Sequence, residues 1–160
     1  MNTAYKSSLE VCKRHADRLA WAMSWLRGKF PLSPNTLQDM EDTELAVLDQ
    51  FSTRFSKLQD AMGAKLFPAV LELTKEQGEF SAFLDKLYRL EKMGAISSAE
   101  HWLLLREMRN EFSHDYPDDP AIQSAILNKA YNLAGDLLST LNQIEMFAAK
   151  YLGSNAERDL

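Results

Sequence analysis

Apolar residues recur at three- and four-residue steps along most of this chain, which is the period of amphipathic helices. The first such stripe predicts a helix over 7–27 that ends at Gly28. Its apolar positions are Leu9, Cys12, Ala16, Leu19, Ala20, Met23 and Leu26. Pro31 and Pro34 then predict a loop over 30–35, because either ring would break a helix.

A longer stripe predicts a second helix that begins at Asp42 or Thr43 and ends at Gly78. Its apolar positions are Leu48, Phe51, Phe55, Leu58, Met62 and Leu66. Pro68 lacks a backbone N–H, so we expect this helix to kink or split near 65–67. The acidic run at its start suits the positive end of a helix dipole, and a less favoured interpretation is a metal site. The acidic residues of this run are Asp39, Glu41, Asp42 and Glu44.

A short helix is predicted over 80–92, with Gly94 as its C-terminal cap. Ser97 or Ser98 then caps a helix that runs to about residue 116.

Pro117 blocks continuation of that helix, and a last helix is predicted over 121–151, ended by Gly153 and followed by a flexible tail over about 154–160. No strand pattern, repeat or low-complexity segment is visible. The sequence therefore predicts one all-α domain spanning 1–160, an up-and-down four-helix bundle with an additional short helix.

Composition narrows the class of protein. The apolar share of 46% and the charged share of 26% are typical of a globular domain, while a net charge of -5 excludes a global basic field for nucleic acid or membrane. The single cysteine, Cys12, excludes an internal disulfide and a cysteine-based zinc cluster. Neither a signal peptide nor a membrane-spanning run is evident, so we expect a soluble, cytoplasmic protein that does not bind membranes.

Candidate chemistry is concentrated in the eight residues from Arg109 to Tyr116. On a helical wheel, an apolar side predicted to face the core holds Leu104, Leu105, Met108 and Phe112. The opposite, polar side holds Arg109, Ser113, Arg106, Asn110 and His114. Leu103 lies within this polar side and needs a cover, and a second copy of the helix across a two-fold axis is the simplest one. We therefore expect a homodimer.

Arginine and histidine together suit phosphoryl chemistry. His114 lies in the last turn of its predicted helix, where the dipole favours the imidazolium, and it can move a proton on or off a ribose hydroxyl. Arg109 can neutralise charge that develops on a phosphate, and the scheme needs no metal or other cofactor. The alternative is an ordinary solvated surface. We expect His15 to be exposed and His101 to lie at the core edge. We expect the three tryptophans to serve packing, and a less favoured interpretation is that they stack on nucleic-acid bases. These tryptophans are Trp21, Trp25 and Trp102.

The string from Arg109 to Tyr116 has the form R-N-x-x-x-H-x-Y and closes a predicted helix in a small helical protein. It resembles the HEPN superfamily, and within it the HepT-like toxins and related helical partners of minimal nucleotidyltransferases. The resemblance implies a helical bundle that dimerises through the motif helix and cleaves RNA without a metal. It implies Arg109 as the group that stabilises the phosphate transition state and His114 as the general acid and base.

The resemblance also implies that Asn110 orients the cleft, and that cleavage leaves a cyclic 2′,3′-phosphate. In HepT-like toxins the tyrosine of this motif, here Tyr116, is adenylylated by the cognate nucleotidyltransferase antitoxin. Anionic bulk at that position would block RNA by repulsion and steric exclusion. Ser113 and Arg106 complete the expected site as supporting residues. A second implied function is a non-catalytic substrate-binding or accessory subunit of a nucleotidyltransferase, because some relatives with this motif resemble the helical domain of aminoglycoside nucleotidyltransferases.

Overall fold

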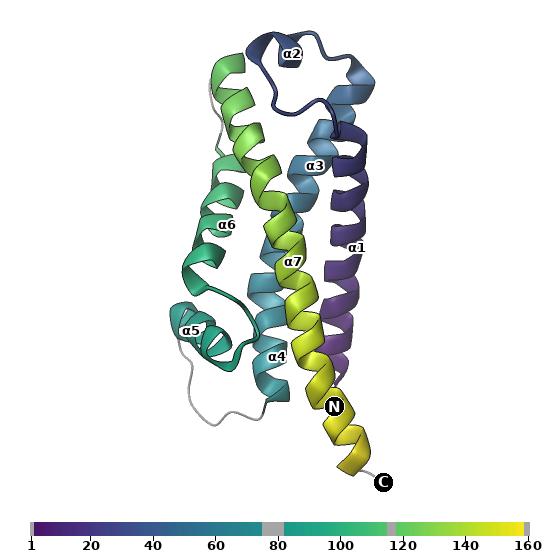
Figure 1. Cartoon of the computed structure of the whole chain (residues 1–160), viewed down its shortest axis with the longest axis vertical. Helices are drawn as coiled ribbons and strands as arrows, with labels where there is room; N and C mark the ends of the chain where they lie inside the picture. The colour runs from purple at the N-terminus through teal and green to yellow at the C-terminus, as the bar shows by residue number, and fades with distance from the viewer. Residues whose placement is uncertain (1, 75–81, 115–117, 159–160) are drawn as a thin grey trace.

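The computed structural model describes residues 2–74, 82–114 and 118–158, and within these ranges the regular structure is entirely helical. Figure 1 shows long helices side by side, with α7 running the length of the molecule. The helices are α1 (Thr3–Leu26), α2 (Pro34–Gln38), α3 (Asp42–Ala61), η1 (Met62–Leu66), α4 (Phe67–Leu73), α5 (Phe83–Met93), α6 (Ala99–Phe112) and α7 (Pro120–Arg158). Within the described ranges, none of these helices is both long and apolar enough to cross a bilayer.

The packing is organised around the α3–η1–α4 rod. α1 lies along this rod, and α6 packs against both α3 and α7. In Figure 1, α1 and α6 flank α7 on opposite sides, and α5 lies across the end of α6. Rings fill the centre, where Phe55 meets Phe112 edge to face at 5.6 Å and Phe67 lies 4.5 Å from Trp102. These ring contacts hold Phe112, the last residue of α6, against α3, and Trp102 of α6 against α4.

Several predicted helix caps are confirmed. The Ser98 hydroxyl accepts a hydrogen bond from the His101 N–H, and Gly94 ends α5 in the left-handed region at φ 84°. The acidic start of α3 forms a capping box between Glu41 and Glu44.

The disturbance expected near Pro68 is present as the π-helical turn of η1, which lies directly before the proline. A wider turn spares the proline ring a clash with the carbonyl four residues earlier, so the rod continues into α4.

Several predicted boundaries are wrong. α1 begins at Thr3 rather than near residue 7, and α4 ends at Leu73, before the predicted end at Gly78. The loop expected over 30–35 is shorter than predicted, because the short helix α2 begins at Pro34, with Ser33 as its N-cap. The motif helix stops at Phe112 rather than near residue 116. Gly153 does not end the last helix, which continues to Arg158, where a tail was expected.

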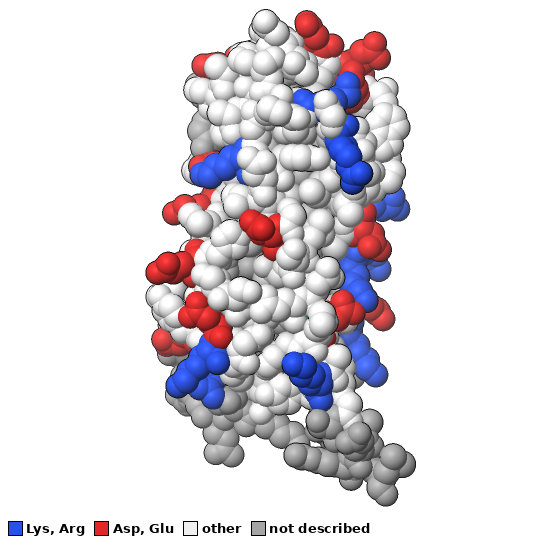
Figure 2. All heavy atoms as spheres, in the orientation of Figure 1, with Lys and Arg blue, Asp and Glu red and all other residues white. Residues whose placement is uncertain are grey.

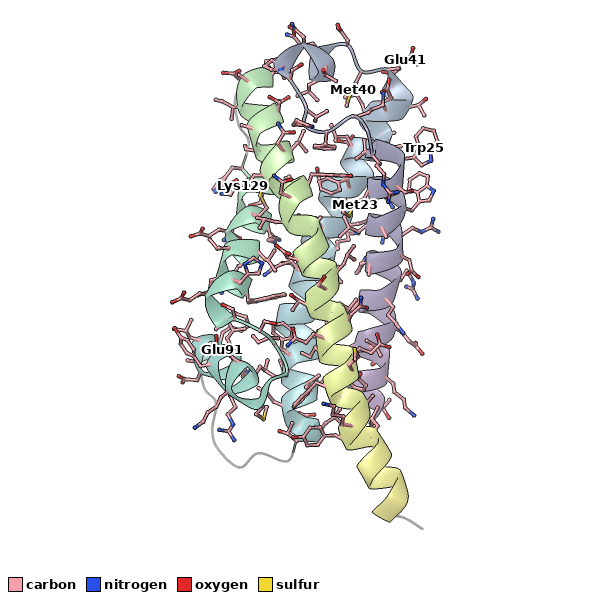
Figure 3. The ribbon with its side chains drawn as sticks, viewed as in Figure 1. Met23, Trp25, Met40, Glu41, Glu91 and Lys129 are labelled. Atoms are coloured by element: carbon pink, nitrogen blue, oxygen red, sulfur yellow. The ribbon has the colours of Figure 1, made fainter. Side chains whose placement is uncertain are left out.

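Two of the three tryptophans do not pack in the core. Trp102 is buried, as expected, but Trp21 and Trp25 are 46% and 52% exposed on α1. Figure 3 shows Trp25 projecting away from the neighbouring helices. The packing interpretation is therefore wrong for this pair.

Candidate functional site

The motif residues divide between the end of α6 and the segment that follows it. Ser113 and His114 lie just beyond the helix, and their N–H groups reach back three positions to the carbonyls of Asn110 and Glu111. The Ser113 hydroxyl also donates to the Asn110 carbonyl at 2.7 Å. These short-range bonds tighten the last turn and end the helix. Tyr116, the expected modification site, lies outside the described residues.

Arg109 is held by a carboxylate from another helix. Its Nε donates to Oδ1 of Asp60 at 2.8 Å, and its Nη2 donates to Oδ2 at 2.9 Å. This pair joins α6 to α3 while the arginine side chain stays 30% exposed. The hydrogen bonds to Asp60 raise the pKa of Arg109, so the guanidinium is charged at any physiological pH.

Arg106 lines a hollow that the same carboxylate also lines. Its guanidinium carbon is 5.2 Å from the ring centroid of Phe83, a cation–π distance. Arg106, Phe83 and Asp60 line a hollow of about 200 Å³ together with Gly63 of η1. Two arginines of α6 thus flank one exposed face of α3.

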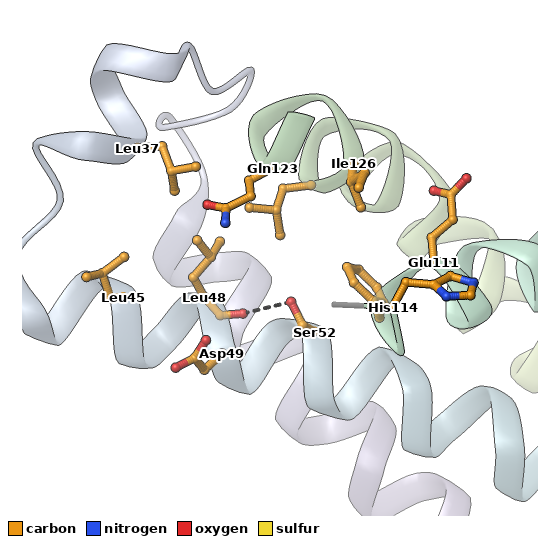
Figure 4. Close-up of a pocket in the computed structure, with 11 residues that line it drawn as sticks. Leu37, Leu45, Leu48, Asp49, Ser52, Glu111, His114, Gln123 and Ile126 are labelled. Carbon is orange, nitrogen blue, oxygen red and sulfur yellow. Dashed lines mark hydrogen bonds between the residues drawn. The ribbon is translucent and has the colours of Figure 1, made fainter. Parts of the chain in front are cut away.

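His114 lines a different and larger hollow, with a volume of about 360 Å³. Figure 4 shows the imidazole at one end of this pocket, beside Glu111 and across from Ser52 of α3. Most of the remaining lining residues are apolar, and Asp49 adds a second carboxylate. Glu111 is partly neutralised by Lys129 of α7, whose Nζ lies 3.6 Å from Oε1 of Glu111.

The structure therefore does not gather the motif into one cleft within a single chain. Arg109 turns toward Asp60, and it is not among the residues that line the pocket of His114. The end of the helix contributes to the separation, because α6 stops at Phe112 and His114 follows in the turn beyond it. The Asn110 and Ser113 side chains are exposed between the two positions.

The apolar face of α6 is confirmed at Leu105 and Met108, which are buried, but not at Leu104. Leu104 was expected in the core but is 49% exposed, whereas Leu103 is partly buried against the core. The buried Trp102 and Ala99 shift the centre of the packed face away from Leu104. Leu103 is therefore only partly exposed, and its place at a dimer interface stays a prediction.

Sequence reasoning missed Asp60, the partner of Arg109, because it lies 49 positions away on another helix. The helical wheel of α3 does indicate that Asp60 faces away from the core. On the wheel of α3, Asp60 lies roughly opposite Phe51 and Phe55, where a carboxylate meets solvent or a cation. Among the residues that the structure describes, no three side chains of His, Cys, Asp or Glu lie close enough to share a metal ion.

No protein-family model matches this sequence, and no curated protein or solved structure matches it either.

Proposed function

We propose that this protein is a metal-independent endoribonuclease, the cytoplasmic toxin of a HEPN and nucleotidyltransferase toxin–antitoxin pair. In this proposal the helices form a four-helix up-and-down bundle with α5 as the additional short helix, and two copies pair through α6. The pairing brings arginines and histidines from both copies to one shared cleft. The motif from Arg109 to His114 and the geometry of Arg109 support it.

The state of Arg109 is the observation that carries the proposal. A guanidinium has five N–H donors, and Asp60 accepts hydrogen bonds from two of them. The other three have no acceptor among the described residues. A cation that is fixed in orientation and still partly exposed binds a phosphate without first losing side-chain freedom. Asp60 acts as a positioning residue in this scheme.

His114 supplies the proton transfers. Its imidazole removes the proton from a ribose 2′-hydroxyl, and the oxygen attacks the adjacent phosphorus. The bond from phosphorus to the 5′-oxygen breaks, the imidazolium returns the proton to that oxygen, and a cyclic 2′,3′-phosphate remains. Arg109 stabilises the charge on the phosphate during the step, while Asn110, Ser113 and Arg106 support the cleft.

A second candidate is a non-catalytic subunit that completes a nucleotidyltransferase. The two carboxylates in the pocket of His114, Asp49 and Glu111, favour this alternative, because they repel a phosphate. In either case the partner is a minimal nucleotidyltransferase, and Tyr116 is the residue that it would adenylylate.

Incubation of the purified protein with structured RNA separates the candidates. We expect cleavage by the wild type, cyclic phosphate ends, and activity reduced at least a hundredfold in Arg109→Ala and in His114→Ala. Arg27→Ala and His101→Gln change the same residue types away from the motif and should cleave normally. Absence of cleavage by folded wild type, together with tight binding to the nucleotidyltransferase, would support the subunit instead.

A further inference from the structure

Four exposed side chains form one stripe along α1. Arg14, Arg18, Trp21 and Trp25 follow one another at steps of four, three and four residues. At 100° per residue these positions lie within about 60° of each other, so all four project from the same side of the helix. All four are exposed, and the core residues Cys12 and Leu19 occupy the opposite side of α1.

The neighbouring helix α3 adds two cations beside this stripe. Arg54 donates from Nη1 to Nδ1 of His15 at 2.9 Å, which joins the two helices. The pKa of His15 is lowered first by burial and then by the positive charges of Arg54, Lys57 and Arg14. These three cations therefore lie near the same imidazole. We call the surface formed by Arg14, Arg18, Trp21, Trp25, Arg54 and Lys57 the α1/α3 face.

The cations of this face lie among carboxylates, in a chain whose net charge is -5. Figure 2 shows blue and red groups alternating along the edge formed by α1, and few charges over α7. Glu10 and Asp17 of α1 carry opposite charge close to the stripe. An attraction for phosphates is thus local, and binding should depend steeply on salt.

The two indoles add a second kind of contact. Trp21 and Trp25 lie 6.2 Å apart between centroids and are tilted by 48°, so their faces are not stacked on one another. Exposed rings beside arginines are the groups on which single-stranded nucleic acids stack their bases. A duplex hides its bases, so it gains only the phosphate contacts.

We propose that the α1/α3 face binds single-stranded RNA, with phosphates against the arginines and bases on the indoles. The reason to expect RNA rests on the proposed function. On α3, Lys57 and Asp60 are three positions apart and lie on neighbouring turns of one side. The face therefore leads from α1 across α3 to Arg109, which Asp60 holds. RNA bound there would reach the proposed cleft.

Binding can be measured without cleavage. A fluorescein-labelled oligouridylate of about 16 nucleotides, titrated with His114→Ala protein, gives Kd from anisotropy and base stacking from tryptophan quenching. The buried Trp102 should not respond. We expect Arg14→Ala/Arg18→Ala to weaken binding at least tenfold and to reduce the slope of log K against log salt by about 1.4. We expect Trp21→Ala/Trp25→Ala to weaken binding at least about thirtyfold, remove the quenching and leave the slope unchanged.

The charge-matched control is Lys86→Ala/Lys92→Ala on α5, which should leave Kd and slope unchanged. Wild-type affinity in both α1 double variants, or no binding at low salt, overturns the proposal. The proposal is also overturned if the protein does not bind RNA and sedimentation shows that Trp21→Ala/Trp25→Ala loses a dimer that the unsubstituted protein forms. That result would assign the face to a second copy of the chain. RNA that is bound through this face but never cleaved by wild type refutes the nuclease alone. Cleaved RNA with unchanged binding in the variants refutes the face alone.

Discussion

Both carboxylate oxygens of Asp60 accept hydrogen bonds from Arg109, at 2.8 and 2.9 Å, across the contact between α3 and α6. The pair is only partly buried, so its contribution to the free energy of unfolding is small. Its main effect is geometric, because a bidentate contact fixes the plane of the guanidinium as well as its position. Stability and activity should therefore respond differently when the carboxylate is removed.

Asp60→Ala tests this difference. We expect RNA cleavage to fall about tenfold or more through kcat, with KM nearly unchanged, because Arg109 remains charged but loses its orientation. The free energy of unfolding should fall by less than about 1 kcal/mol. Glu145→Ala breaks another exposed pair, that with Lys13, and serves as the control that should retain full kcat. A loss of stability in proportion to the loss of activity would contradict a positioning role.

Gly135→Ala should stabilise the protein. Gly135 lies within α7, is exposed, and a Cβ built on it meets nothing within 4 Å. Alanine has the higher helix propensity, so we expect the free energy of unfolding to rise by about 0.5–1 kcal/mol in urea titrations. An unchanged or lower midpoint would show that the helix is already disturbed at this position.

Gly94→Ala should have the opposite sign. A Cβ there also meets open space, but φ of 84° places the residue in the left-handed region. We expect a loss of about 1 kcal/mol, measured in the same titrations. The two substitutions are identical in chemistry, so a difference in sign between them reports the backbone conformation alone.

Native Cys12 should resist thiol reagents. Burial raises the pKa of its thiol to about 12, so the reactive thiolate is scarce at pH 8. We expect iodoacetamide to modify the native protein at least a hundredfold more slowly than the protein in denaturing urea. Mass spectrometry of quenched aliquots gives both rates. Fast labelling of the folded protein would mean that α1 opens without global unfolding.

The sequence predicted helix caps well and helix faces less well, for a physical reason. Caps depend on one residue and its immediate backbone, as at Ser98 and Gly94. The face of α6 depends on its neighbours, because Trp102 packs 4.5 Å from Phe67 and turns Leu104 outward.

The candidate site shows the same limit. Adjacency in the motif identified Arg109 and His114. The carboxylate that Arg109 meets comes from α3, and the residues that line the pocket with His114 come partly from α3 and α7, far along the chain. A motif predicts residue types and spacing; it does not predict which carboxylate a long arginine side chain will meet. The exposed Trp21 and Trp25 were missed for a related reason, since tryptophan alone does not distinguish packing from a stacking platform.

His15 should make stability fall in mild acid. It lies half-buried against Arg54 rather than exposed as expected, and burial followed by the charges of Arg54, Lys57 and Arg14 lowers its pKa in the folded state. The unfolded chain has the ordinary value of about 6.5, so below that pH the unfolded state binds the proton first. Acidification through this window therefore favours unfolding. In His15→Gln, where an amide oxygen can still accept from Arg54, this part of the pH dependence should disappear. Urea titrations of both proteins at pH 7.5 and pH 5 measure the difference, and parallel losses of stability would show that another group is responsible.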